Sequence, residues 1–234
     1  MGAPATESPR ISIVIPVFNE IEVIDRLQDK LATVKHRCEV IFADGGSVDG
    51  TLDRIRPDFS LVTSDKGRAC QMNEGARSSS GDILFFLHAD SIPPDGFVDE
   101  ITEVVKRSEV GCFGMVFDEK TPFLILCQIA SNWRCRSRGI VFGDQGFFID
   151  RELFFEVGMF PDIPLMEDFQ LSLTLREKGY HPEMTPSRIT TSARRFSGSP
   201  LHQLRTMVSM FNLRRAYRRG TSIHQIAAAY QDIR

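Results

Sequence analysis

Residues 81–91 have the sequence GDILFFLHADS, in which a run of apolar side chains ends on a histidine and an aspartate. The run from 83 to 88 is the strongest strand signal in the chain, because its large apolar residues follow one another without interruption. The aspartate at its end, Asp90, has two interpretations. It caps the following turn, or it holds a metal ion against a phosphate group.

Shorter apolar runs precede this strand, and segments with helical periodicity separate them. Strands are predicted at 11–15, 39–43 and 60–63, and helices at 20–34, near 47–49 and at 67–77. Strands that alternate with helices predict an α/β fold with a mostly parallel central sheet and helices on both faces. Ligands of such sheets bind at the carboxyl ends of the strands, which is where Asp44 and Asp90 lie.

The second half of the chain has a less regular pattern. We expect strands at 111–117 and 147–149, and helices at 122–138, 165–178 and 200–219. Gly179 is a good terminator for the helix at 165–178. The helix at 200–219 carries Leu204, Val208 and Phe211 on one side.

The composition is that of an ordinary globular protein. The 234 residues are 42% hydrophobic and 25% charged, and the net charge of −3 gives no general attraction for nucleic acid. The five cysteines form no CxxC pair, which favours reduced thiols over a disulfide framework. Without a signal-peptide core or an apolar run long enough to span a bilayer, we expect a cytoplasmic protein that is at most peripheral to a membrane.

Two segments of the first half are candidates for nucleotide contacts. Asp44 begins the turn DGGS at 44–47, which is either structural or brings a carboxylate and close backbone to a base or ribose. Its glycines do not have the GxGxxG spacing of a dinucleotide-binding loop. Lys66, Gly67 and Arg68 precede a helix and form either a diphosphate anchor or a solvated basic turn.

Carboxylates at 90 and 167–168 are candidates for chemistry. Asp90 can hold Mn²⁺ or Mg²⁺ through one oxygen, while His88, on the same side of an extended chain, packs or bonds beside it. Glu167 and Asp168 either complement the helix dipole or provide a general base, Asp168. Since they are adjacent on a helix, only one of them points at a given substrate atom.

Four segments, taken in their order, resemble the family 2 glycosyltransferases with the GT-A fold. They are IPVFNE at 15–20, FADGGSVDGT at 42–51, LHAD at 87–90 and MEDFQLSLTLREKG at 166–179. GRACQMNEGA at 67–76 and the segment 143–168 narrow the resemblance to a small bacterial-type subgroup with LHAD in place of DxD.

The resemblance implies an inverting transfer of one sugar from a nucleoside diphosphate, UDP- or GDP-linked, to an acceptor hydroxyl. By position, the nucleotide sugar contacts Pro16, Phe18, Glu20, Asp44, Gly67, Arg68, His88 and Asp90. It also implies that Asp90 binds a divalent metal, Mn²⁺ or Mg²⁺, and that Asp168, next to Glu167, is the catalytic base.

Two departures from the family pattern matter. His88 replaces the first carboxylate of DxD, which bears on metal affinity and metal choice. The QxxRW motif of processive synthases is absent, with Arg194-Arg195-Phe196 at best a remnant, so we expect transfer of a single sugar rather than polymerisation.

Acceptor contacts are expected from the second half of the chain. The loop at Asp144, Gln145 and Gly146 is the better candidate, and Trp133 is either a sugar-stacking platform or, in the preferred interpretation, a helix-packing residue. The arginine-rich helix at 200–219 either packs on the domain with a wet basic face, which is preferred, or rests on an anionic membrane near a lipid-linked acceptor. The acceptor is therefore expected to be either a lipid-linked molecule or a small molecule.

The resemblance divides the chain into a disordered tail at 1–9, a GT-A catalytic domain at 10–198 and C-terminal helices at 199–234. Within the catalytic domain, 10–95 form the nucleotide-binding half and 96–198 the acceptor-binding half. Two rival functions stay open: an α/β methyltransferase that uses the loop at Asp44, and a degenerate protein that binds nucleotide sugar without turnover.

Overall fold

The computed structural model describes residues 9–196 and 200–231, and residues 1–8 of the predicted tail lie outside this range. The strands are β1 (Ile11–Val17), β2 (Cys38–Asp44), β3 (Ser60–Thr63), β4 (Ile83–Phe86), β5 (Ser91–Ile92), β6 (Val110–Cys112), β7 (Met115–Phe117), β8 (Phe147–Asp150), β9 (Glu183–Met184) and β10 (Ile189–Thr191). The α-helices are α1 (Ile24–Ala32), α2 (Thr51–Arg54), α3 (Arg68–Ser78), α4 (Phe97–Val105), α5 (Pro122–Arg138), α6 (Arg151–Glu156), α7 (Glu167–Glu177), α8 (Pro200–Arg218) and α9 (Ile223–Gln231). Two short 3₁₀ turns lie at Gly143–Gln145 and Arg194–Phe196.

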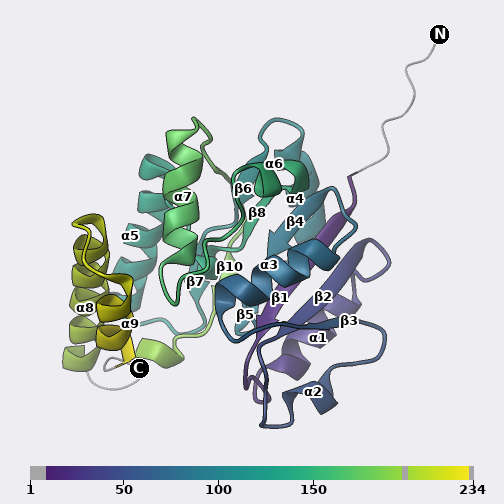
Figure 1. Ribbon diagram of the computed structural model, residues 1–234, viewed down its shortest axis with the longest axis horizontal. Coiled ribbons are helices and arrows are strands. Elements are labelled where there is room, and N and C mark those ends of the chain that lie inside the picture. The colour runs from purple at the N-terminus through teal and green to yellow at the C-terminus, as the bar shows by residue number, and fades with distance from the viewer. Residues whose placement is uncertain (1–8, 197–199, 232–234) are drawn as a thin grey trace.

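A seven-stranded sheet of order β3-β2-β1-β4-β8-β6-β9 forms the centre of the molecule (Figure 1). The pairs β1–β2, β2–β3, β1–β4 and β6–β9 are parallel, which confirms the expected mostly parallel α/β sheet. Strand β8 is antiparallel to both β4 and β6. The carboxyl ends of β1, β2 and β4 therefore meet at one edge of the sheet.

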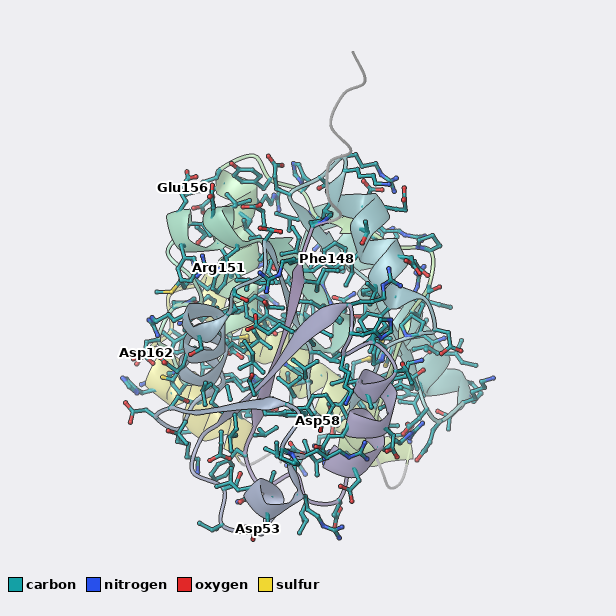
Figure 2. All side chains as sticks on the ribbon, turned by 90° about the vertical axis from the view of Figure 1, so that its right-hand side faces the viewer. Asp53, Asp58, Phe148, Arg151, Glu156 and Asp162 are labelled. Carbon is teal, nitrogen blue, oxygen red and sulfur yellow. The ribbon has the colours of Figure 1, made fainter. Side chains whose placement is uncertain are left out.

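Helices cover both faces of this sheet, because successive side chains of a strand point to opposite sides. On one face, Ile13 and Phe85 pack with α1 and α4. On the other, Val14 and Phe86 pack with α3 and α6. Phe148 of β8 is fully buried in the middle of the molecule, whereas Asp53, Asp58, Glu156 and Asp162 lie at its outside (Figure 2).

The single strand predicted at 111–117 is wrong, because the chain turns within it. Gly114 has a φ of +68°, which glycine adopts readily and which separates β6 from β7. The side-chain amide of Asn132 on α5 fixes the backbone of the next residue, Met115. Its Oδ1 accepts from the Met115 N–H at 2.9 Å, and its Nδ2 donates to the Met115 carbonyl oxygen at 2.9 Å. Strand β7 joins β5 and β10 in a second, three-stranded sheet that the sequence did not predict.

Helices α5 and α8 lie on the side of the molecule away from β1 and β2 (Figure 1). The Cys127 thiol of α5 contacts the Met207 sulfur of α8 at 3.6 Å. Helix α8 packs inward through residues such as Leu213, which joins Ile226 of α9 in a small apolar cluster. Within the described residues, no helix is long and apolar enough to cross a membrane.

Candidate active site

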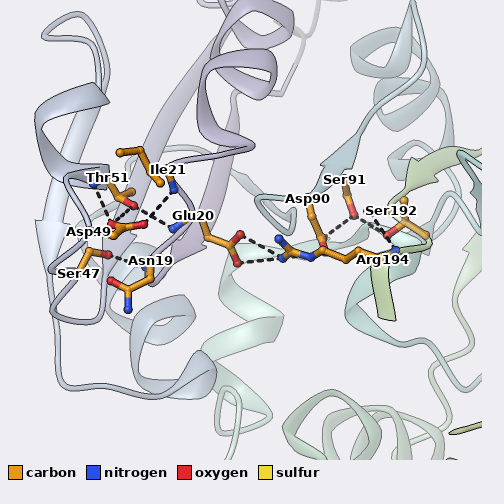
Figure 3. A network of polar contacts seen from close by, with 11 residues as sticks. Asn19, Glu20, Ile21, Ser47, Asp49, Thr51, Asp90, Ser91, Ser192 and Arg194 are labelled. Carbon is orange, nitrogen blue, oxygen red and sulfur yellow. Dashed lines mark hydrogen bonds and ion pairs between the residues drawn. The ribbon is translucent and has the colours of Figure 1, made fainter. Parts of the chain in front are cut away.

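The loops that follow β1 and β2 are tied to each other by hydrogen bonds from the backbone of one loop to side chains of the other (Figure 3). The Asn19 N–H donates to Ser47 Oγ at 2.9 Å, and the Glu20 N–H donates to Thr51 Oγ1 at 2.9 Å. These bonds fix the backbone at Glu20 beside the end of the sheet.

Asp44 holds its own turn. Its buried carboxylate accepts hydrogen bonds from the Gly46 N–H at 2.7 Å, from the Ser47 N–H at 3.1 Å and from Ser47 Oγ at 2.5 Å. These bonds support the structural interpretation of the DGGS turn, in which the carboxylate orders the loop.

A buried glutamine that the sequence analysis did not single out links the ends of β1 and β2. The Gln71 amide on α3 donates to the carbonyl oxygens of Val17 at 2.6 Å and Ala43 at 2.9 Å. Both carbonyls are buried, and that of Val17 also accepts from the Gly45 N–H at 3.1 Å, so the amide adds a bond that ties the two strand ends together. The expected helix start at Gly67 is confirmed, and α3 begins at Arg68.

The side chains expected around the nucleotide are distributed along this edge. Pro16 is buried in β1, while Phe18 is half-buried just beyond its end. The Lys66 ammonium lies 4.1 Å from the centroid of the Phe18 ring, a cation–π contact. The structure thus places one apolar face and one cation next to each other at the end of β1.

Arg194, set aside in the sequence as a remnant, lies between two of the expected site residues (Figure 3). Its guanidinium is 3.1 Å from Glu20 Oε2 and 3.2 Å from Asp90 Oδ2. Pairing of β10 with β5 explains this position, because Thr191 lies opposite Ser91 in the small sheet. The gap between the two carboxylates therefore already accommodates a cation.

The gap between Glu20 and Asp90 has the ligand chemistry of a cation site. Two carboxylates facing one gap supply the oxygen ligands that Mn²⁺ and Mg²⁺ prefer, and the guanidinium of Arg194 stands in for the cation there. Among the described residues, no cluster of three or more histidine, cysteine, aspartate and glutamate side chains is arranged to hold a metal.

His88 and Asp90 were expected on the same side of an extended chain. The chain is not extended between them, so this expectation is wrong. β4 ends at Phe86, and the Ser91 N–H donates to the His88 carbonyl oxygen at 3.1 Å, which closes a turn. The His88 ring instead packs on Gly143, where a Cβ would lie only 2.1 Å from His88 Nε2. Only glycine permits this contact.

The same glycine positions Asp168. The Gly143 N–H donates to Asp168 Oδ2 at 2.9 Å, so that residues 88, 143 and 168 meet at one point. Ser172, one turn further along α7, exchanges hydrogen bonds of 3.0 and 3.1 Å with the backbone of Val141 and so anchors the chain before Gly143. A pocket at this point is lined by His88, Phe142, Gly143, Glu167 and Asp168, together with Met72 of α3.

Glu167 and Asp168 have different surroundings, as expected for neighbours on a helix. The Glu167 side chain is 2% exposed and its Oε1 lies 2.9 Å from Arg68 Nε. Burial raises the pKa of Glu167, the Arg68 guanidinium opposes this rise, and the charge of Asp168 adds to it. Arg68 therefore links the start of α3 to α7, and Asp168 is the member of the pair that is hydrogen-bonded to Gly143, although both line the pocket.

The expected acceptor residues are not equivalent. Gln145 is fully buried, and its Oε1 accepts hydrogen bonds from the Phe142 N–H at 3.1 Å and from Arg134 at 3.2 Å. Gly146 packs against Ile189, while Asp144 lies in the 3₁₀ turn that follows Phe142. Gln145 and Gly146 thus hold the shape of the loop.

Trp133 is 59% exposed, so the preferred interpretation of a packed tryptophan is wrong. Leu204, Val208 and Phe211 of α8 are also exposed. The expectation that α8 packs on the domain with a wet basic face is confirmed, because Leu213 packs with Phe169 of α7 while the arginines at 205, 215 and 219 are exposed. The inward face is formed by Leu213 rather than by the three exposed apolar residues.

Residues 12–158 match the family model "Glycosyl transferase family 2". This match covers more than half of the chain, which therefore belongs to the family 2 glycosyltransferases.

Among curated relatives, the chain is 26% identical over 213 residues to "Probable glycosyltransferase YdaM" of Bacillus subtilis, covering 79% of this chain and 50% of the relative. It is 33% identical over 122 residues to "Uncharacterized glycosyltransferase Rv1514c" of Mycobacterium tuberculosis, covering 47% of each. The chain thus spans about half the length of these relatives.

Solved structures share the fold. A mannosyltransferase from Pyrobaculum calidifontis in complex with GDP-Man and Mn²⁺ has a TM-score of 0.65 at 20% identity, covering 96% of this chain and 70% of its own. Glucosyl-3-phosphoglycerate synthase from Mycobacterium tuberculosis, with Mn²⁺, UDP and phosphoglyceric acid, has a TM-score of 0.60 at 17% identity, covering 92% and 80%. These likenesses confirm a GT-A type fold.

Proposed function

We propose that this chain is an inverting glycosyltransferase that moves one sugar from a nucleoside diphosphate to an acceptor hydroxyl, with Asp168 as general base. The observation that carries the proposal is the meeting of His88, Gly143 and Asp168 beside one pocket. It joins the turn that carries Asp90 to the start of α7.

Asp168 would take the proton of the acceptor hydroxyl as its oxygen attacks the anomeric carbon from the face opposite the diphosphate. The bond between that carbon and the diphosphate oxygen breaks as the new bond forms, and the diphosphate leaves with the bonding electrons. Two backbone donors support this role, because the Gly143 N–H at 2.9 Å orients Asp168 Oδ2 and the Phe169 N–H at 2.7 Å orients Oδ1. Each oxygen retains a further lone pair that can take the proton.

Asp90 would hold the divalent metal, Mn²⁺ or Mg²⁺, together with oxygens of the diphosphate. The metal would supply positive charge to the departing diphosphate. Glu20 lies on the opposite side of the same gap, and Arg194 must leave Asp90 when a metal enters. The same guanidinium is then available for a phosphate oxygen.

The nucleotide would lie along the carboxyl ends of β1 and β2. Pro16 and Phe18 would provide an apolar wall, and Lys66 and Gly67 would approach the diphosphate at the start of α3. Asp44 would act on the base or ribose through the turn that it orders.

The acceptor would enter from the side of α5, past the loop at Asp144. Trp133 is exposed on this helix and is accessible for stacking on a sugar or a lipid chain. The family match does not support the alternative of a methyltransferase. The other alternative, a protein that binds nucleotide sugar without turnover, is tested by the experiment below.

We assign the outer faces of α5 and α8 to contact with an anionic membrane that carries a lipid-linked acceptor. Each of these neighbouring helices turns apolar side chains outward: Leu126, Ile129 and Trp133 on α5, and Leu204, Val208 and Phe211 on α8. Exposed arginines accompany them, at 136 and 138 on α5 and at 205, 215 and 219 on or after α8. An apolar face with a basic border is typical of helices that lie on anionic lipid.

The test of the membrane contact is cosedimentation with vesicles. We expect binding to phosphatidylcholine vesicles that contain phosphatidylglycerol, and its loss in a Trp133→Ser, Phe211→Ser variant. Retained binding by that variant contradicts the contact, and a dimer of the wild-type chain in analytical ultracentrifugation would assign the face to a second copy.

The test of the catalytic proposal is calorimetric titration of UDP and GDP with Mn²⁺ and then with EDTA, followed by donor hydrolysis. We expect metal-dependent binding of one nucleotide. Asp168→Asn should retain this binding and lose roughly 10²- to 10⁴-fold in sugar transfer, the usual contribution of a general base. Loss of nucleotide binding in Asp168→Asn would contradict the assigned role, and binding without hydrolysis or transfer by the wild-type chain would support the degenerate alternative.

A further inference from the structure

Three arginines from two helices converge on the aromatic rings at the acceptor side of the pocket. The guanidinium carbons of Arg134 (α5) and Arg214 (α8) lie 4.2 and 5.4 Å from the centroid of the same ring, Phe142. That of Arg218, one turn further along α8, lies 5.1 Å from the centroid of Phe169. We call Arg134, Arg214 and Arg218 the arginine triad.

The triad is close to the proposed base. Phe142 lines the pocket together with Asp168 and His88, and Phe169 is the residue that follows Asp168. The two rings are themselves in contact, with centroids 6.0 Å apart. A group bound by the triad therefore lies next to the position at which an acceptor hydroxyl would meet Asp168.

Within the described part of the chain, no carboxylate lies within salt-bridge distance of the triad. Arg134 uses one nitrogen for neutral partners, Ser131 Oγ at 2.9 Å and Gln145 Oε1 at 3.2 Å. The arginines of the donor side differ, since both Arg68 and Arg194 pair directly with carboxylates. Three arginines thus lie near Asp168 without the direct carboxylate partners that Arg68 and Arg194 have.

Such an arrangement costs free energy, which the nearby carboxylates of Asp144 and Asp168 offset only in part. Arg134 and Arg214 are half-buried, and guanidinium groups that lose water without gaining a counter-ion are destabilised. Burial lowers the pKa of Arg134 to about 10, although Asp144 opposes this shift. Burial also lowers the pKa of Arg214, where Asp144 again opposes the shift and Arg218 adds to it.

We propose that the arginine triad is an anion-binding subsite, and that the acceptor carries a phosphate or carboxylate group near the hydroxyl that receives the sugar. This inference rests on the proposed function. Guanidinium groups match the planar or tetrahedral oxygens of such anions with two hydrogen bonds each. Their stacking on Phe142 and Phe169 holds them in place before the ligand arrives.

The anion has two sources, a soluble phosphate ester or the head group of a lipid-linked acceptor. Three probes distinguish them: inorganic phosphate, glycerol 3-phosphate, and phosphatidylcholine vesicles with and without phosphatidic acid. Binding of the soluble probes by calorimetry indicates a soluble ester, whereas binding only to the phosphatidic acid vesicles indicates a lipid head group.

The variants are Arg134→Gln and the double variant Arg214→Gln, Arg218→Gln, with Arg215→Gln as the control. Arg215 lies on α8 beside the triad but is exposed and forms no ring contact with the described residues. We expect each triad variant to weaken binding of the preferred anion at least tenfold, as for loss of a charge-assisted hydrogen bond. Arg215→Gln should leave it unchanged.

Nucleotide binding separates this inference from the proposed function. The triad variants should bind UDP or GDP as the wild-type chain does, because the triad lies on the acceptor side. Loss of nucleotide binding in these variants would reassign the triad to the donor diphosphate and overturn the inference. Unchanged anion binding in both triad variants would also overturn it, whereas a wild-type chain that binds the anion but no nucleotide would refute only the proposed function. Thermal melting of each variant confirms that it is folded, and the exposed Arg218→Gln alone provides a second test if the double variant is not.

Discussion

Replacement of Arg194 by glutamine should strengthen the binding of Mn²⁺ to the chain in the absence of nucleotide. At the proposed site, a metal held by Asp90 would compete with Arg194, so it must first break the ion pair at 3.2 Å. The variant no longer has this ion pair to break. The effect is a direct consequence of competition between two cations for one carboxylate.

The size of the effect follows from the exposure of the pair. The Arg194 side chain is 48% exposed and that of Asp90 is 21% exposed, so solvent screens their attraction. Pairs of this kind contribute about 0.2–1 kcal/mol. We therefore expect Mn²⁺ affinity to rise by roughly 1.4- to 5-fold, since about 1.4 kcal/mol corresponds to a tenfold change.

The assay is titration of Mn²⁺ at low ionic strength, followed by electron paramagnetic resonance of the unbound ion. Arg194→Lys retains the cation and should stay close to the wild-type affinity. Arg107→Gln is the matched control, because it removes an arginine that pairs with Glu183 on the edge strand β9. The gain of Arg194→Gln should shrink as salt is added, since screening already weakens the ion pair. Unchanged or weaker Mn²⁺ binding in Arg194→Gln would refute the assignment of the metal to Asp90.

Three further predictions concern residues that shape the site. Gly143→Ala should lower kcat/KM roughly 10²-fold with nucleotide binding retained. The new Cβ would lie 2.1 Å from His88 Nε2, so the imidazole ring must move by about 1 Å. Unchanged kinetics would show that the position of the His88 ring does not matter. Gln71→Ala should lower the free energy of unfolding by about 1–3 kcal/mol in urea, because the buried carbonyl of Ala43 loses the Gln71 donor and that of Val17 keeps only the Gly45 N–H. A loss well below 1 kcal/mol would contradict this role. The pKa of Glu167 is raised, so its contribution to stability is complete below the ordinary glutamate pKa and is lost as the pH rises through the folded-state value. The stability difference between the wild-type chain and Glu167→Gln should therefore favour the wild-type chain more at pH 5 than at pH 7.5 in thermal melts, and a difference independent of pH would contradict the raised pKa.

Local patterns in the sequence predicted the first half of the fold well. Apolar runs at 11–15 and 39–43 became β1 and β2, and the carboxylates that follow strands lie at the expected edge of the sheet. The segment 111–117 failed because its apolar pattern is continuous, while the turn at Gly114 is fixed by Asn132 on a later helix. A contact with a distant side chain leaves no periodic signal.

The residues that α8 turns inward could not be predicted from the sequence for a related reason. Leu204, Val208 and Phe211 have the spacing of a buried face, yet they are exposed, and Leu213 faces α9 instead. Periodicity identifies an apolar side of a helix but not what covers it. A membrane or a partner protein serves as well as the core, which explains why the helix and its packing on the domain were predicted correctly and the residues that it buries were not.

The position of Arg194 is a further tertiary contact that the sequence pattern did not reveal, and it affects the chemistry of the site. The resemblance implied that His88 replaces one carboxylate of the family motif, which bears on the affinity and choice of the expected metal. The structure adds a guanidinium between Glu20 and Asp90, so the site has one anion fewer and one cation more than the motif suggests. Both changes act in the same direction, because each makes the gap less attractive to a second cation and more attractive to a diphosphate. Donor binding should therefore depend less on the metal here than in relatives with both carboxylates, and Arg194 should supply part of the charge that a metal supplies there.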